Sequence, residues 1–204
     1  MAVCKTFPAE AIHEASRAGQ RLFGENRVQE FETKAKAVAD LAEIEVHMIG
    51  HLQSNKARRA VELFQAIDSV DSLKLAERLN AAASELNKTI PVLLEINVGG
   101  EEAKAGLSVD WTDVEPLLAN AKQWTNLEIR GLMAVPPFTD DPEGARPYFR
   151  QLRELREEIA RRKFARVSME TLSIGMSHDF EVAIEEGSTC VRIGSAIFGA
   201  RPRA

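Results

Sequence analysis

The chain has 204 residues, 45% of them hydrophobic and 28% charged, which is typical of one globular domain spanning residues 1–204. Its formal net charge of −5 provides no overall basic field, and this argues against nonspecific binding to nucleic acid or to an anionic membrane surface. The sequence has no apolar run long enough for a signal peptide or a membrane span, so we expect a cytoplasmic protein.

Short apolar runs alternate with amphipathic helical patterns, as in parallel sheets whose strands are joined by crossover helices. The candidate strands are Ala2–Lys5, Arg21–Glu25, Glu45–Ile49, Ala66–Val70, Ile90–Asn97, Leu127–Ala134, Glu170–Ser173 and Cys190–Ile193. This alternation predicts an α/β fold with a single (β/α)8 TIM barrel, although an open doubly wound sheet would show the same alternation. We favour the barrel because of the strand count and because no early glycine-rich dinucleotide fingerprint is present.

Two of the intervening segments have clear helical patterns. One follows Ser72, a residue that favours helix starts, and its apolar positions are Leu75, Ala76, Leu79, Ala83 and Leu86. The apolar positions of the other are Tyr148, Phe149, Leu152, Leu155 and Ile159. Opposite charges four residues apart predict a solvated outer face for this second helix; the pairs are Arg150–Glu154, Arg153–Glu157 and Glu158–Arg162.

The first predicted strand begins at residue 2 with no helix before it. We therefore expect the amino end of the barrel to be covered either by another subunit or by chain upstream of Met1, and we expect a monomer or a weak dimer. Cys4 and Cys190 fall in the first and last strands, where reduced thiols are expected. Neither the cysteines nor the 4 histidines show the spacing of a zinc motif, so no metal site is predicted.

Active groups of such barrels lie at the carboxyl ends of the strands and in the loops that follow. Polar residues occupy several of these positions: Lys5, Glu25–Arg27, Gly50–Asn55, Asn97, Ser173–His178 and Arg192–Phe198. If the sheet closes, Lys5 lies beside Arg192 and the glycine turn after it. This layout suits a phosphorylated aldehyde that is held covalently by a lysine, and pyridoxal 5'-phosphate (PLP) is the candidate cofactor.

Lys5 and Arg192 each have a functional and a structural interpretation. A lysine at a strand end is ordinarily solvated, but partial desolvation and the like charge of Arg192 would favour the neutral amine that a Schiff base requires. Arg192 lies in an apolar strand, so it needs an anionic or acceptor partner. In the structural interpretation, Arg192 forms a salt bridge. In the functional one, it donates to the pyridine nitrogen of PLP, which would keep that nitrogen unprotonated and weaken the carbanion chemistry of the cofactor.

The predicted phosphate site lies at Gly194 and Ser195, after the last strand. Barrels often bind phosphate between the loops that follow strands seven and eight, with backbone amides at the start of a short helix. The opposite wall would be the loop that follows the seventh strand, where Ser177 can donate its hydroxyl group. Ser177 could instead cap the helix that begins near Asp179.

At these positions the chain resembles the YggS/PROSC family of pyridoxal phosphate homeostasis proteins. The resemblance covers nearly the whole chain. Its motifs here are Ala2–Thr6, Phe23–Glu30, His47–Lys56, Gly131–Ala134, Leu172–Phe180 and Val191–Gly199.

The resemblance implies a barrel like the amino-terminal domain of alanine racemase, with PLP held as an internal aldimine on Lys5. The residues that match positions expected around the cofactor are Asn26, Ser177, Arg192, Gly194 and Ser195, the last two near the phosphate. It also implies a role in vitamin B6 homeostasis without established turnover. Two features depart from the family pattern: the helix ahead of the first strand is missing, and Cys4 replaces a common serine.

Three functions stay open at this point. The first is a noncatalytic PLP carrier that regulates the intracellular pool and hands PLP over to apo forms of PLP-dependent enzymes. The second is a PLP-dependent amino-acid racemase, although racemisation needs acid or base groups on both faces of the substrate carbon. The third is a protein-interaction module in which PLP only stabilises the barrel. We favour the carrier and predict no catalytic residues.

Overall fold

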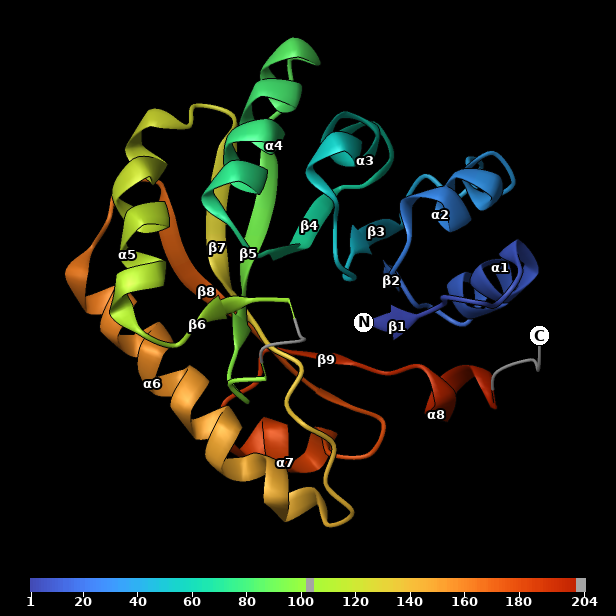
Figure 1. The fold of residues 1–204 in the computed structure, drawn as a ribbon. Helices are drawn as coiled ribbons and strands as arrows, with labels where there is room; N and C mark the ends of the chain where they lie inside the picture. The colour runs from blue at the N-terminus through green and yellow to red at the C-terminus, as the bar shows by residue number, and fades with distance from the viewer. Residues whose placement is uncertain (102–104, 201–204) are drawn as a thin grey trace.

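The computed structural model describes residues 1–101 and 105–200. Within these residues, eight parallel strands form one sheet in the order β1-β2-β3-β4-β5-β7-β8-β9 (Figure 1). Their bounds are β1 (Ala2–Val3), β2 (Leu22–Glu25), β3 (Glu45–Met48), β4 (Ala66–Val70), β5 (Ile90–Asn97), β7 (Leu127–Met133), β8 (Val167–Met176) and β9 (Cys190–Arg192). A further short strand, β6 (Leu107–Ser108), pairs with β5 outside this order.

The first and last strands meet through a parallel bridge between Ala2 and Ile193. The Val3 amide donates to the Ile193 carbonyl oxygen at 2.8 Å, and the Ile193 amide donates to the Met1 carbonyl oxygen at 2.9 Å. These bonds bring the two edges of the sheet together. The fold is therefore a nearly closed (β/α)8 barrel, which confirms the barrel and excludes the open doubly wound sheet.

The helices follow the strands and lie around the outside of the barrel (Figure 1). They are α1 (Ala9–Arg17), α2 (Val28–Ala35), α3 (Ala57–Leu63), α4 (Leu73–Glu85), α5 (Trp111–Asn120), α6 (Arg146–Arg162), α7 (Phe180–Glu185) and α8 (Ser195–Phe198), with 3-10 turns η1 (Ser54–Lys56), η2 (Ala121–Gln123) and η3 (Pro142–Ala145). Among the described residues, no helix combines the length and apolar character needed to span a bilayer.

The helix starting after Ser72 is confirmed: the Leu75 amide donates to the Ser72 hydroxyl oxygen at 3.3 Å. The seventh predicted strand is correct in place but too short, because β8 begins at Val167 and ends at Met176. The first is too long, since the turn that carries Lys5 follows β1 directly.

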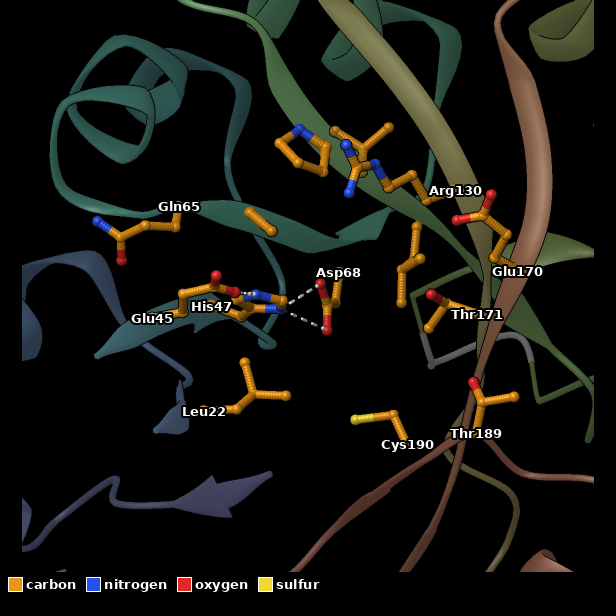
Figure 2. Close-up of a pocket in the computed structure, with 14 residues that line it drawn as sticks. Leu22, Glu45, His47, Gln65, Asp68, Arg130, Glu170, Thr171, Thr189 and Cys190 are labelled. Atoms are coloured by element: carbon orange, nitrogen blue, oxygen red, sulfur yellow. Dashed lines mark hydrogen bonds and ion pairs between the residues drawn. The ribbon is translucent and has the colours of Figure 1, made fainter. Parts of the chain in front are cut away.

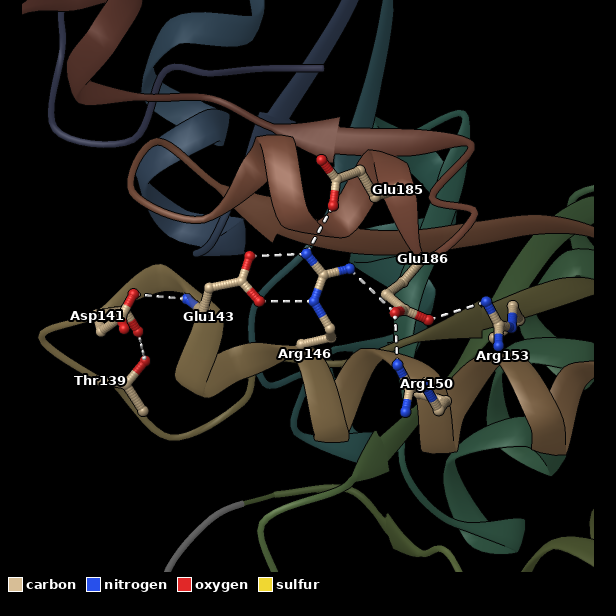
Figure 3. Close-up of polar contacts among 8 residues, drawn as sticks. All are labelled: Thr139, Asp141, Glu143, Arg146, Arg150, Arg153, Glu185 and Glu186. Carbon is tan, nitrogen blue, oxygen red and sulfur yellow. Dashed lines mark hydrogen bonds and ion pairs between the residues drawn. The ribbon is translucent and has the colours of Figure 1, made fainter.

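The charged face of α6 keeps two of the three predicted pairs and also contacts a buried carboxylate, Glu186 (Figure 3). Glu186, which is only 4% exposed, accepts from Arg146 at 3.2 Å and from Arg150 at 3.3 Å, and its other oxygen lies 2.8 Å from Arg153. Arg150 thus contacts Glu186, which follows α7. The expected Arg153–Glu157 and Glu158–Arg162 pairs are present, with partly exposed side chains. For Arg150 the structure shows a different partner, because Glu186 lies 36 residues away in the chain. This cluster ties α6 to the end of α7.

The barrel interior holds a cavity of about 450 Å³ at the amino ends of the strands (Figure 2). His47 lies in it, with Nδ1 at 3.1 Å from Asp68 Oδ1. Burial lowers the pKa of His47, but the hydrogen bond and the charge of Asp68 outweigh it, and the pKa is above its ordinary value. Pro91, Val92 and Leu93 of β5 also line this cavity.

Candidate functional site

The six predicted site residues lie at the opposite end of the barrel, where the strands have their carboxyl ends. Lys5 lies two residues beyond β1, Asn26 follows β2, and Ser177 follows β8. Arg192 ends β9, and Gly194 and Ser195 come directly after it. Because β8, β9, β1 and β2 are consecutive around the barrel, the structure brings all six to one sector of its mouth.

Gly194 lies where the turn after β9 passes close to β1. A Cβ atom at this position would lie 3.4 Å from the Val3 carbonyl oxygen and 3.7 Å from the Val3 Cβ atom. These are ordinary van der Waals distances, and they place the turn after β9 directly beside the strand that leads to Lys5.

Asn26 has a buried side-chain oxygen, Oδ1, that accepts no hydrogen bond from the residues that the structure describes. Its backbone packs against Gly50, where an added Cβ atom would lie 2.3 Å from the Asn26 carbonyl oxygen. A buried acceptor without a partner is costly. The Asn26 side chain is thus suited to accept from a ligand in the mouth.

Ser177 joins the loop after β8 to the helix after β9. Its hydroxyl oxygen lies 3.4 Å from the amide nitrogen of Ala196, in the first turn of α8. The alternative that Ser177 caps the next helix is wrong: the residue at the N-cap of α7 is Asp179. The Asp179 carboxylate accepts from the Met176 amide at 2.6 Å and so holds the loop that carries Ser177.

Arg192 is 4% exposed and has acceptor partners, as its place in an apolar strand predicts. Its Nη1 donates to the carbonyl and hydroxyl oxygens of Ser173 at 2.7 and 2.8 Å, and its Nη2 donates to the Ala134 carbonyl oxygen at 2.8 Å. Burial lowers the pKa of the Arg192 guanidinium, while nearby groups that include Glu95 oppose this shift. These three acceptors fix the guanidinium within the barrel.

Glu95 is a residue of the mouth that the sequence analysis did not single out. It lies near the carboxyl end of β5, and its carboxyl group interacts with the charges of Asp71, Arg192 and His51, which follow or end other strands of the barrel. Burial raises the pKa of Glu95 to about 7, helped by the charge of Asp71 and opposed by Arg192 and His51. Its Oε2 is buried and has no hydrogen-bond partner among the described residues. A glutamate within an otherwise apolar strand was the signal in the sequence.

Comparison with known proteins places this barrel in a family. The model for the alanine racemase N-terminal domain matches residues 1–202. The pyridoxal phosphate homeostasis protein of Aquifex aeolicus is 46% identical over 197 residues, which cover 97% of this chain and 84% of the relative. This chain belongs to the pyridoxal phosphate homeostasis protein family. The family member of Pseudomonas aeruginosa is 44% identical over 201 residues, with 98% of this chain and 84% of the relative covered.

Solved structures agree with this membership in the pyridoxal phosphate homeostasis protein family. PipY of Synechococcus elongatus, solved with PLP bound, has a TM-score of 0.88 at 40% identity, and the match covers 98% of this chain and 91% of PipY. Alanine racemase of Clostridium difficile has a TM-score of 0.77 at 13% identity over 99% of this chain and 51% of its own. The second likeness concerns the fold alone. The resemblance noted in the sequence is thereby confirmed.

Proposed function

We propose that this protein binds PLP in the mouth of its barrel and acts in PLP homeostasis by holding the cofactor and handing it to apo forms of PLP-dependent enzymes. The observation that carries the proposal is the convergence of Lys5, Asn26, Ser177 and Arg192 on one sector of the mouth. Membership in the pyridoxal phosphate homeostasis family and the PLP-bound structure of PipY support the choice of cofactor.

The residues present fit PLP. Asn26 offers a buried oxygen that lacks a partner among the described residues, and the Ser177 hydroxyl and the Ala196 amide adjoin each other where a phosphate would bind. Gly194 and Ser195 supply the short turn beside them. The held guanidinium of Arg192 adds positive charge to a site for an anionic ligand. PLP supplies an aldehyde that condenses with amines.

Lys5 is the amine that we propose for the covalent bond. The thiol of Cys4, the residue before it, contacts Glu25 on the outer side of the barrel wall at 3.3 Å. The turn after β1 carries Lys5 beside the turn that follows β9, and we propose that its side chain reaches into the mouth there. Its nitrogen attacks the aldehyde carbon, a C=N bond forms, and the oxygen leaves as water.

The amino-acid racemase alternative has one observation in its favour: the carboxyl group of Glu95, with a pKa of about 7, is able to accept and donate a proton. The two functions differ in chemistry. A racemase exchanges the α-proton of its amino acid with deuterated solvent, whereas a carrier transfers PLP to an apo-enzyme without this exchange. We expect transfer and no exchange.

Lys5→Ala should abolish the near-visible absorption band that forms when PLP is added to the apo protein, because no other amine of the site takes the place of Lys5. Lys122→Ala, which changes an exposed lysine of η2 outside the proposed site, is the matched control and should keep the band. Spectrophotometric titration of the three proteins tests this. Persistence of the band in Lys5→Ala would reject the attachment.

Ser177→Ala should weaken PLP binding by about tenfold, since it removes one hydrogen bond to a charged phosphate. Pyridoxal, which lacks the phosphate, should bind wild type and variant equally. Equilibrium titrations with both compounds separate the two effects. An equal loss for pyridoxal would show that Ser177 does not act through the phosphate.

A further inference from the structure

A buried ionic cluster lies behind the turn that carries Lys5. Lys34 on α2 is 9% exposed, and its ammonium group lies 2.9 Å from Glu25 Oε1 and 2.9 Å from Glu30 Oε1. Glu25, the last residue of β2, is fully buried. We call Glu25, Glu30 and Lys34 the Lys34 cluster.

The Lys34 cluster binds both peptide groups that flank Lys5. The Lys34 ammonium group donates to the carbonyl oxygen of Cys4 at 3.3 Å. The amide of Thr6 donates to the carboxylate of Glu30. The residues before and after Lys5 are therefore attached, through one side chain each, to the same ion-paired group on β2 and α2.

The backbone at this turn needs such support. Thr6 has a φ of +67°, a left-handed conformation that is unfavourable for a β-branched residue. The bond from the Thr6 amide to Glu30 holds this conformation, and the Phe7 amide, which donates to the Cys4 carbonyl oxygen at 3.1 Å, closes the turn. The turn after β1 is thus fixed by specific contacts.

The composition of the Lys34 cluster points to a role beyond packing. Burying the Glu25 carboxylate and the Lys34 ammonium group is expensive, and apolar residues of similar volume often stabilise a fold equally well. Glu25 also keeps one oxygen, Oε2, that is buried without a hydrogen-bond partner among the described residues. Ionic groups at this place give the turn directional contacts that apolar side chains cannot provide.

We propose that Lys34, together with Glu25 and Glu30, positions Lys5 for its condensation with PLP by fixing the peptide groups on both sides of it. These are positioning residues, since they act through Lys5. The inference rests on the proposed function. It adds that the rate and affinity of covalent attachment depend on the Lys34 cluster. Noncovalent binding of the phosphate group and the pyridine ring of PLP does not depend on it.

The test compares two ligands in the full-length apo protein. PLP reports covalent attachment through the near-visible band, and pyridoxine 5'-phosphate, which has an alcohol in place of the aldehyde, reports noncovalent binding alone. Glu30→Ala removes the bond to Thr6 and leaves the Lys34–Glu25 pair. We expect attachment of PLP to slow at least about tenfold, as for the loss of one charge-assisted positioning bond, while affinity for pyridoxine 5'-phosphate stays within about twofold of wild type.

Two further variants cover the buried pair. Lys34→Met leaves Glu25 buried without its cation, so it is paired with the double variant Glu25→Gln/Lys34→Met, which carries no buried charge and keeps the side-chain sizes. Both should attach PLP slowly. Lys34→Arg should recover part of the rate, because it restores a cation that can donate to Glu25 and Glu30.

The outcomes are distinct. Slow attachment with unchanged binding of pyridoxine 5'-phosphate supports the inference. Wild-type attachment rates in Glu30→Ala and in the double variant overturn it, and so does an equal loss for both ligands, which would mark a purely structural role. If the wild-type protein forms no band with PLP, the proposed function itself fails, and the inference fails with it.

Discussion

Gly131→Ala should lower the free energy of unfolding by about 3 kcal/mol, the upper part of the range for overpacking a filled interior. A Cβ atom at Gly131 would lie 1.8 Å from the Thr171 carbonyl oxygen, so β7 and β8 would have to separate. The loss of stability is large because the contact is with a backbone atom of Thr171, which cannot move aside as a flexible side chain could. These two strands lead to Ala134 and Ser173, which hold Arg192, and the variant should therefore also bind PLP less well.

Chemical denaturation of Gly131→Ala and of Arg130→Ala tests this. Arg130 is the neighbouring residue on β7, and its exposed side chain is paired with Glu128 at 2.7 Å. Its loss should change stability by less than about 1 kcal/mol. Similar stabilities for the two variants would contradict the close approach of β7 and β8.

Glu95→Gln should stabilise the apo protein at neutral and alkaline pH and have little effect in acid. Burial raises the pKa of Glu95 from 4.5 to about 7, so the folded state keeps a proton that the unfolded state releases. The stability that depends on this proton is fully present below the unfolded pKa and is lost as pH rises toward the folded pKa. A pKa shift of this size changes the free energy of unfolding by about 3 kcal/mol between acid and alkaline pH.

Urea unfolding at about pH 4 and about pH 8 measures this difference. The wild-type protein should lose stability relative to Glu95→Gln over this interval, by up to about 3 kcal/mol. A difference between the two proteins that is the same at both pH values would show that Glu95 does not keep its proton in the folded state.

The sequence was sufficient for the architecture because the signals are local. Apolar runs located the eight main strands, and Ser72 located the start of α4. The number of strands predicted the barrel, because a sheet of eight parallel strands closes when its first and last strands meet. In the structure they meet at Ala2 and Ile193. The short strand β6 has too few residues for an apolar pattern, and it was missed.

The candidate site was predictable in position and less so in its contacts. Strand ends place Lys5, Asn26 and Arg192 at the same rim in any closed parallel barrel. The contacts of the site come from distant segments: Arg192 donates to Ala134, 58 residues away, and Lys34 donates to the carbonyl oxygen of Cys4, 30 residues away. Charged residues in helices and strands are ordinarily solvated, so the burial of Lys34 required the three-dimensional structure.

The most direct test of the central claim is borohydride reduction of the PLP-loaded wild-type protein followed by peptide mass mapping. Reduction makes the bond between lysine and cofactor permanent, so the modified residue is identified directly. We predict a phosphopyridoxyl group on the peptide that contains Lys5. A modification confined to another lysine, or no modification at all, would contradict the account.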